Sequence, residues 1–180
     1  PSSEVPYVSD DGMLLVPTVE IVGKRADYEL PGTEENWKGV FLEGRIVTLS
    51  EYEIAKTETT YKLWKEVYDW ALQHDYHFLK EGFKGGKDGE AYGLPSAPNL
   101  DGSDYQPVTK ITTADMMVWC NAYSEMLGLA RVYHYKGEPY KDARLKEEIA
   151  GHNVWVYGVL EVKDEQGYRL PTTFEWEANH

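Results

Sequence analysis

The stretch that decides the fold is Tyr168-Arg169-Leu170-Pro171-Thr172-Thr173-Phe174-Glu175-Trp176-Glu177, near the end of the 180 residues. Thr172 is followed three positions later by Glu175, which is the spacing of a capping box at the start of an α-helix. The sequence therefore predicts a helix that begins here. Because this helix would stop at His180 without a capping signal, we expect residues 1–180 to be the larger, amino-terminal part of one domain.

Two earlier segments have the periodicity of amphipathic helices. In residues 59–73, apolar side chains recur at helical spacing and include Leu63, Val67, Trp70 and Ala71. Residues 113–127 show a second apolar face, preceded by Thr112 and Asp115 at capping-box spacing and followed by Gly128 at the usual carboxyl-terminal cap position. The sequence thus predicts three helices in all.

Short strands are expected around these helices. Residues 13–22 are apolar and β-branched but contain Pro17, which is typical of an edge strand, and residues 39–49 predict a hairpin that turns at Glu43-Gly44. Further strands are expected at residues 52–55, 132–135 and 154–162, and one or two helical turns at 142–149. Residues 81–106 hold six glycines and two prolines, which predicts a long irregular segment.

Three blocks of the chain, taken in order, resemble the formylglycine-generating enzyme and sulfatase-modifying factor superfamily. YEIAKTETTYKLW (52–64) looks like that family's strand and helix start, and QPVTKITTADMMVWCN (106–121) is similar to its Pro-Val block before an aromatic-Cys helix. The quoted stretch at 168–177 is close to its most specific signature, Arg-Leu-Pro-Thr followed by Glu-Trp-Glu. Thr113 and Thr173-Phe174 depart from the usual residues, and we interpret these changes as drift at core or cap positions.

The resemblance implies one α+β domain over residues 1–180 with a C-type-lectin-like fold, few regular elements and long ligand-bearing loops. The family's enzymes oxidise a protein cysteine to formylglycine with a copper ion held by two cysteines after the Glu-Trp-Glu helix, a position beyond His180. Other members are non-catalytic, notably variable proteins diversified by retroelements, which display a ligand-binding face. Because fold alone does not decide function, we weigh both classes.

We expect a non-catalytic display protein that resembles these variable proteins and binds a protein or glycan ligand. A copper-dependent formylglycine-generating oxidase is the alternative, and a purely structural lipoprotein domain is a third class. Members of this type are often exported, so the expected location is the cell surface or periplasm. No catalytic, cofactor-binding or metal-binding residue is predicted, and calcium or copper is expected only together with a further carboxyl-terminal segment.

Composition narrows the range of partners. The chain has 31 acidic and 18 basic residues, for a net charge of −13, which disfavours nucleic acid and anionic membrane surfaces. No apolar run approaches the roughly 18 residues of a membrane span. Cys120 is the single cysteine, which excludes an internal disulfide and zinc sites built on several cysteines.

Structural roles are predicted for several residues. Cys120 lies on the apolar face of the second helix and is expected to be a buried, inert thiol. Arg169 is expected to be partly buried and to pair with Glu58 or with a carboxylate of the third helix, such as Glu175 or Glu177. Each helix is expected to be anchored in the core by one tryptophan, namely Trp64, Trp119 and Trp176.

Other candidates have a simple and a functional interpretation. His74 and His77 have helical spacing and would need a further acidic ligand to hold a metal, so a favourable position near a helix carboxyl terminus is preferred. Oxygen-rich loop residues fit solvated turns better than a calcium site: Asp88, Asn99, Asp101 and Asp104. Acidic residues at 142–148 are interpreted as a solvated helix edge: Asp142, Glu147 and Glu148. Loop tyrosines stay open between core packing and ligand contact: Tyr92, Tyr105, Tyr133, Tyr135 and Tyr140.

Overall fold

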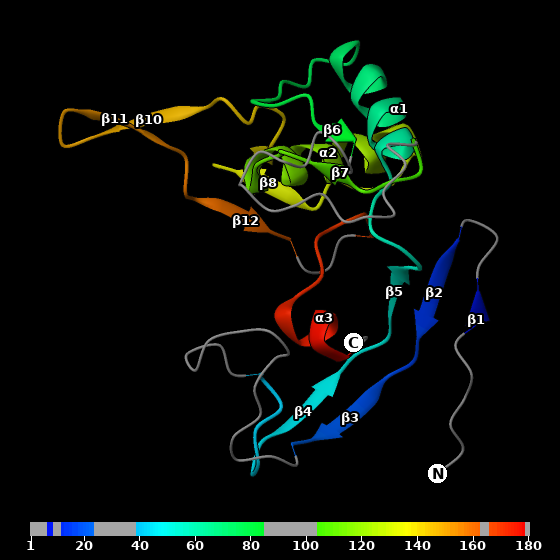
Figure 1. Cartoon of the computed structure of the whole chain (residues 1–180). Coiled ribbons are helices and arrows are strands. Elements are labelled where there is room, and N and C mark those ends of the chain that lie inside the picture. Colours follow the sequence, from blue (N-terminus) through cyan, green and yellow to red (C-terminus); the bar gives the residue numbers. More distant parts are fainter. Residues whose placement is uncertain (1–6, 9–11, 24–38, 85–103, 163–165, 179–180) are drawn as a thin grey trace, which may run out of the picture. The chain divides into compact units, whose positions relative to one another are not determined.

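The computed structural model describes residues 7–8, 12–23, 39–84, 104–162 and 166–178 (Figure 1). The chain divides into two compact units. Unit 1 comprises Pro1–Thr57 and Pro171–His180, and unit 2 comprises Glu58–Leu170. None of the helices in the described ranges is both long and apolar enough to cross a membrane.

Unit 1 contains two small antiparallel sheets and one short helix. Strands β1 (Tyr7–Val8), β2 (Met13–Val16) and β5 (Tyr52–Ala55) form a sheet in the order β1-β2-β5. Strands β3 (Val19–Val22) and β4 (Ile46–Leu49) form the second sheet. The predicted strand at 52–55 is confirmed. The predicted edge strand at 13–22 is instead two strands in different sheets, because Pro17 lacks the N–H that a continuous ladder would need at that point.

The predicted hairpin at 39–49 is wrong in its pairing. The turn at Glu43-Gly44 is present, with Arg45 N donating to the carbonyl oxygen of Leu42 over 3.0 Å and Gly44 at a φ of 80°. However, β4 pairs with β3, and Gly23 N extends that ladder by donating to Arg45 O over 2.9 Å. An added Cβ at Gly23 would lie 1.8 Å from Leu42 O, so glycine allows the two backbones to approach.

Helix α3 (Thr173–Ala178) confirms the capping box that opened the sequence analysis. Thr172 N donates to a carboxylate oxygen of Glu175 over 2.8 Å, and Glu175 N donates to the Thr172 hydroxyl over 3.2 Å. Val40 N donates to both carboxylate oxygens of Glu177, at 3.0 and 2.8 Å. Both glutamates are buried, whereas Trp176 between them is 46% exposed. The prediction that Trp176 is a core anchor is therefore wrong, because the inward-facing carboxylates direct it outward.

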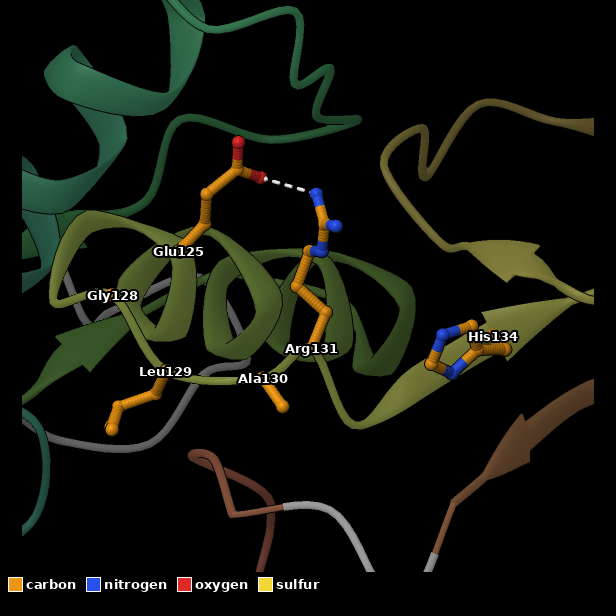
Figure 2. Close-up of a pocket in the computed structure, with 6 residues that line it drawn as sticks. All are labelled: Glu125, Gly128, Leu129, Ala130, Arg131 and His134. Atoms are coloured by element: carbon orange, nitrogen blue, oxygen red, sulfur yellow. Dashed lines mark hydrogen bonds and ion pairs between the residues drawn. The ribbon is translucent and has the colours of Figure 1, made fainter.

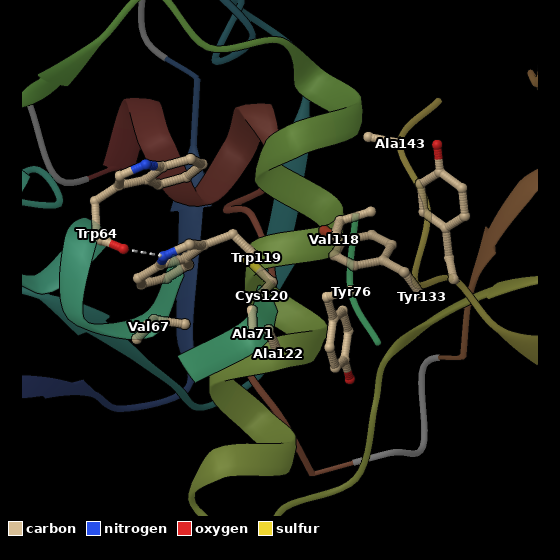
Figure 3. Packing of buried hydrophobic residues seen from close by; sticks show 11 residues of the cluster. Trp64, Val67, Ala71, Tyr76, Val118, Trp119, Cys120, Ala122, Tyr133 and Ala143 are labelled. Carbon is tan, nitrogen blue, oxygen red and sulfur yellow. Dashed lines mark hydrogen bonds between the residues drawn. The ribbon is translucent and has the colours of Figure 1, made fainter. Parts of the chain in front are cut away.

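Unit 2 is organised around helices α1 (Tyr61–Leu72) and α2 (Thr113–Met126), as predicted. Thr112 and Asp115 form the expected capping box of α2, and Thr60 caps α1. In the core between the helices, the rings of Trp64 and Trp119 stack with centroids 5.6 Å apart (Figure 3). Trp119 also donates from Nε1 to the carbonyl oxygen of Trp64 over 3.1 Å. Both predicted tryptophan anchors in this unit are confirmed.

The remaining elements of unit 2 are short strands. Strand β6 (Phe83–Lys84) pairs with β7 (Val108–Thr109), and β8 (Tyr133–Tyr135) lies between β9 (Glu138–Pro139) and β12 (Val159–Glu161). Strands β10 (Lys146–Ile149) and β11 (His152–Trp155) form a separate hairpin. The predicted strand at 154–162 is thus divided between β11 and β12.

The prediction of helical turns at 142–149 is wrong, since this segment ends in strand β10. Lys146 lies opposite Trp155, and Ala150 and Gly151 form the two-residue turn with φ values of 52° and 80°. Positive φ at both positions is typical of the turns that match the twist of a hairpin. Glu147 therefore lies on a strand, where it accepts a hydrogen bond from the Tyr135 hydroxyl over 3.0 Å, and does not belong to a helix edge.

Candidate functional site

A buried asparagine fixes the position of β8 against α2. Asn121 is fully buried, and its Nδ2 donates to the carbonyl oxygens of Tyr133 and Tyr140 over 2.7 and 3.0 Å. Its Oδ1 accepts from Tyr133 N over 3.0 Å. These three bonds set the direction in which the chain leaves α2 and enters β8.

A pocket of about 350 Å³ lies where α2 ends and the chain turns toward β8. Gly128, at a φ of 74°, lets the chain reverse, and Leu129 N donates to Ser124 O over 2.8 Å. Arg131 and His134 follow within a few residues. Figure 2 shows the six residues that line the pocket: Glu125, Gly128, Leu129, Ala130, Arg131 and His134.

Glu125 connects three other polar side chains at this pocket. Its Oε2 accepts hydrogen bonds from the Tyr76 hydroxyl at 2.5 Å and from Arg131 Nη1 at 3.0 Å, and Lys141 Nζ lies 3.2 Å away. Burial alone would raise the pKa of Glu125, but the hydrogen bonds from Tyr76, Lys141 and Arg131 outweigh it and hold the pKa below its usual value. One carboxylate thus faces two cations, Arg131 and Lys141, in a chain whose net charge is −13.

Tyr76 acts as a permanent hydrogen-bond donor in this cluster. Its side chain is buried beneath Lys141, whose Nζ lies 4.4 Å from the ring centroid. Burial, followed by the hydrogen bond to Glu125, raises the pKa of Tyr76 far above its ordinary value. The phenol therefore stays protonated at any physiological pH and orients the carboxylate.

His134 also lines the pocket. Its Nδ1 is buried and has no hydrogen-bond partner among the residues that the structure describes. Leaving such an atom without a partner costs about 1–3 kcal/mol, and because the atom is enclosed it is not open to a ligand in the pocket. Arg131 uses Nη1 for Glu125, so its planar guanidinium can direct other donors to an anionic group.

The residues that line the pocket include neither a thiol nor a hydroxyl side chain. The sequence analysis did not identify Glu125, Arg131 or His134 as site residues. Gly128 marked the end of the helix, but no spacing rule connects Tyr76 or Lys141 with Glu125. Only the packing of α2 against the rest of unit 2 brings these side chains together.

Cys120 lies where the sequence analysis placed it, in the core (Figure 3). It is buried, and burial raises the pKa of its thiol to about 12. The expected burial of the thiol is confirmed, and the raised pKa disfavours the thiolate, which is the reactive and metal-binding form.

Arg169 pairs with a carboxylate that the sequence analysis did not consider. Its Nε lies 3.6 Å from Glu161 on β12, and Nη1 donates to the carbonyl oxygen of Leu170 over 3.1 Å. Glu58 is exposed. The guanidinium thus joins the end of unit 2 to β12, and the pairing of Arg169 with a carboxylate of the third helix stays a prediction.

The histidine pair does not have the predicted helical arrangement. Helix α1 ends at Leu72, His74 stacks on Trp70 with ring centroids 3.7 Å apart, and His77 lies 3.4 Å from Asp75. In the described part of the chain, no group of three or more His, Cys, Asp or Glu side chains is placed to hold a metal ion.

Some of the loop candidates lie within the described residues. Asp104 forms an ion pair with Lys84. Tyr133 and Tyr140 are buried in the core, and Tyr105 is 72% exposed. Four candidates lie outside the described residues: Asp88, Tyr92, Asn99 and Asp101.

The chain was compared with protein-family models, solved structures and curated proteins. Residues 4–179 match the family model of the sulfatase-modifying factor enzyme 1-like domain. The solved structure titled "Crystal Structure of CarF" is 21% identical, with a TM-score of 0.65 over 93% of this chain and 54% of that one. The structure titled "Treponema denticola variable protein 1" is 19% identical, with a TM-score of 0.45 over 89% of this chain and 50% of that one. Among curated proteins, none matches.

The chain thus spans about half the length of these solved structures. The likeness to CarF shows a shared fold, in agreement with the mixed α+β architecture described above. Because the family model covers nearly every residue, the chain belongs to the sulfatase-modifying factor enzyme 1-like domain family.

Proposed function

We propose that this chain is a non-catalytic, ligand-binding domain and that the pocket at the end of α2 receives an anionic group of a protein or glycan ligand. The observation that carries the proposal is the guanidinium of Arg131 at the pocket, with Lys141 on the same Glu125 carboxylate. A carboxylate of the ligand would bind the guanidinium directly. In this proposal the domain works as a display protein of the exported kind, like the variable proteins.

The second candidate is the copper-dependent oxidase that acts on a protein cysteine. Soft Cu(I) is held by thiolates, and Cys120 does not fit this role because it is buried with a pKa of about 12. In this alternative both catalytic cysteines lie after His180. Family membership favours neither candidate, because the fold is a scaffold for both.

Binding is tested with pairs of oligosaccharides that differ only in one carboxylate, a uronic acid and its neutral counterpart. Wild-type protein should bind the acidic member more tightly in calorimetric titrations. Arg131→Ala should weaken binding by about tenfold or more, since a charge-assisted hydrogen bond contributes about 1.5–3 kcal/mol. Arg144→Ala is the matched control, because Arg144 is an exposed arginine that pairs with Asp142 and lies outside the pocket.

The same design is applied to peptide ligands with a free or an amidated carboxyl terminus. His134→Ala is compared with His152→Ala, which removes a histidine on β11. Equal binding of acidic and neutral ligands by every variant would refute the pocket as the binding site.

The oxidase alternative is tested separately. The full-length protein, including any segment after His180, is incubated with a cysteine-containing sulfatase peptide and Cu(I), and the peptide is then analysed by mass spectrometry. An unchanged thiol is expected. Conversion of the thiol to an aldehyde would replace the binding proposal with the oxidase.

A further inference from the structure

The β10–β11 hairpin extends away from the helices of unit 2 (Figure 1). It forms a sheet of its own, and neither outer edge has a neighbouring strand among the described residues. Apolar side chains on or beside it are strongly exposed, including Ile149, Trp155 and Tyr157, the last at 80%. An isolated two-stranded hairpin is marginally stable in water, so such a structure gains most from a further strand.

The two edges of the hairpin differ in charge. Strand β10 carries Lys146, Glu147 and Glu148, whereas residues 152–160 contain no lysine, arginine, aspartate or glutamate. Charged side chains on an edge strand oppose pairing with another strand. A two-fold axis through any of the three charged β10 residues would set that residue against its own copy, and like charges directly opposite are destabilising. On β11, a two-fold axis would not set two like charges against each other, because this strand has no lysine, arginine, aspartate or glutamate.

Alternate residues of β11 direct their backbone N–H and C=O groups to the outer edge of the hairpin. Val156 N donates inward to the carbonyl oxygen of Leu145 over 3.3 Å. Because an antiparallel ladder alternates between bonded and non-bonded pairs, the backbone groups of Asn153 and Trp155 point to the outer edge. A two-fold axis at Trp155 would set Trp155 against its copy, Asn153 against Tyr157, and Val154 against Val156. None of these paired side chains carries a formal charge, and the nearest cation is Lys146 of β10, whose Nζ lies 4.3 Å from the centroid of the Trp155 ring.

We propose that β11 is a docking edge for a second copy of this chain and that antiparallel pairing about a two-fold axis at Trp155 joins two hairpins into a four-stranded sheet. The net charge of −13 opposes the approach of two copies, and salt screens this repulsion. The dimer should therefore strengthen as the salt concentration rises. This inference does not depend on the pocket or on the proposed function.

The test is analytical ultracentrifugation of the full chain over a concentration series. Asn153→Pro removes an outward N–H of β11 without removing an inward one, and Glu148→Pro does the same on β10. Asn153→Pro should raise the dissociation constant of the dimer by about tenfold or more, because each dimer loses two backbone hydrogen bonds. Glu148→Pro should leave the constant within a factor of about two of wild type.

A second pair of variants covers the case in which a proline disturbs the hairpin. Trp155→Lys places like charges across the proposed axis, and Ile149→Lys changes an equally exposed residue at the end of β10. Only Trp155→Lys should weaken the dimer, with both variants giving the circular dichroism spectrum of wild type. A chain that is monomeric at every concentration and salt level, or one that binds only the extended segment of another protein, would overturn the proposal. Equal loss with the β10 variants would overturn it too.

Discussion

The core around α2 and the β10–β11 hairpin belong to the same unit but are stabilised in opposite ways. Around α2, even fully buried polar side chains such as Asn121 and Asp115 have their hydrogen bonds within the chain. On the hairpin, large apolar side chains such as Trp155 remain exposed to solvent. The difference indicates that Asn121 and Asp115 are satisfied within the chain, whereas the hairpin leaves large apolar side chains exposed.

The largest effect should come from Asn121→Leu. This substitution removes the amide partner of Tyr133 N and of Tyr140 O, whereas Tyr133 O still accepts from Tyr140 N, and it should cost about 3–5 kcal/mol in the free energy of unfolding. Urea denaturation measures the loss. The matched change Asn153→Leu on the exposed hairpin should alter the free energy by less than about 0.5 kcal/mol. Comparable losses in both variants would contradict the contrast between the two regions.

A smaller effect is expected for Trp119→Phe. The variant loses the hydrogen bond from Nε1 to Trp64 O and part of the stacked contact, for a destabilisation of about 2 kcal/mol. Trp155→Phe on β11 replaces an indole that is 43% exposed by a smaller ring and should change stability by less than about 0.5 kcal/mol. Thermal denaturation of the two variants beside wild type gives the comparison.

The pH dependence of stability should depend on Glu125, at the edge of the α2 region. Its pKa is held below the ordinary value of 4.5, so the folded state binds this proton less readily than the unfolded state does. The resulting stabilisation is present above the unfolded pKa and is lost as the pH falls through the folded pKa. Glu125→Gln should flatten the fall in unfolding free energy below about pH 4.5, measured by urea titrations at several pH values.

Glu148→Gln is the control for this experiment, because it removes an exposed carboxyl on β10. It accounts for the loss of one negative charge from the chain. A pH profile of Glu125→Gln that coincides with that of this control would contradict the role assigned to the Glu125 cluster.

The smallest effect concerns the hairpin turn. Ala150 has a φ of 52°, a conformation that costs a residue with a Cβ roughly 1–2 kcal/mol. Ala150→Gly removes this strain but makes the unfolded chain more flexible, so we expect a net gain of about 0.5 kcal/mol. Hydrogen exchange of the hairpin amides should slow. If the amides of α2 slow by the same factor, the hairpin unfolds together with the core and the two regions are not independent.

The elements that the sequence predicted well are those with local signals. Both capping boxes, Thr112 with Asp115 and Thr172 with Glu175, are present because a cap depends on side chains three residues apart. The helical faces of α1 and α2 were also correct, since burial follows a fixed period. Cys120 was placed correctly for the same reason.

The errors concern elements whose structure depends on distant partners. Residues 146–149 resemble a charged helix, and Ala150-Gly151 is a weak hairpin signal, so only pairing with β11 makes this segment a strand. The hairpin expected at 39–49 is wrong because β4 pairs with β3 and not with the segment before the turn. The pocket was missed for a related reason: Tyr76, Glu125 and Lys141 belong to separate segments and meet only in the folded unit.

The burial of Cys120 makes the chain its own probe of core opening. Because the thiol is enclosed and protonated in the folded state, a thiol-specific reagent can modify it only when unit 2 opens. With a single cysteine in the sequence, mass spectrometry after timed alkylation reports that one event without ambiguity. The labelling rate, compared with that of the unfolded chain, therefore measures how often the α2 core opens under native conditions.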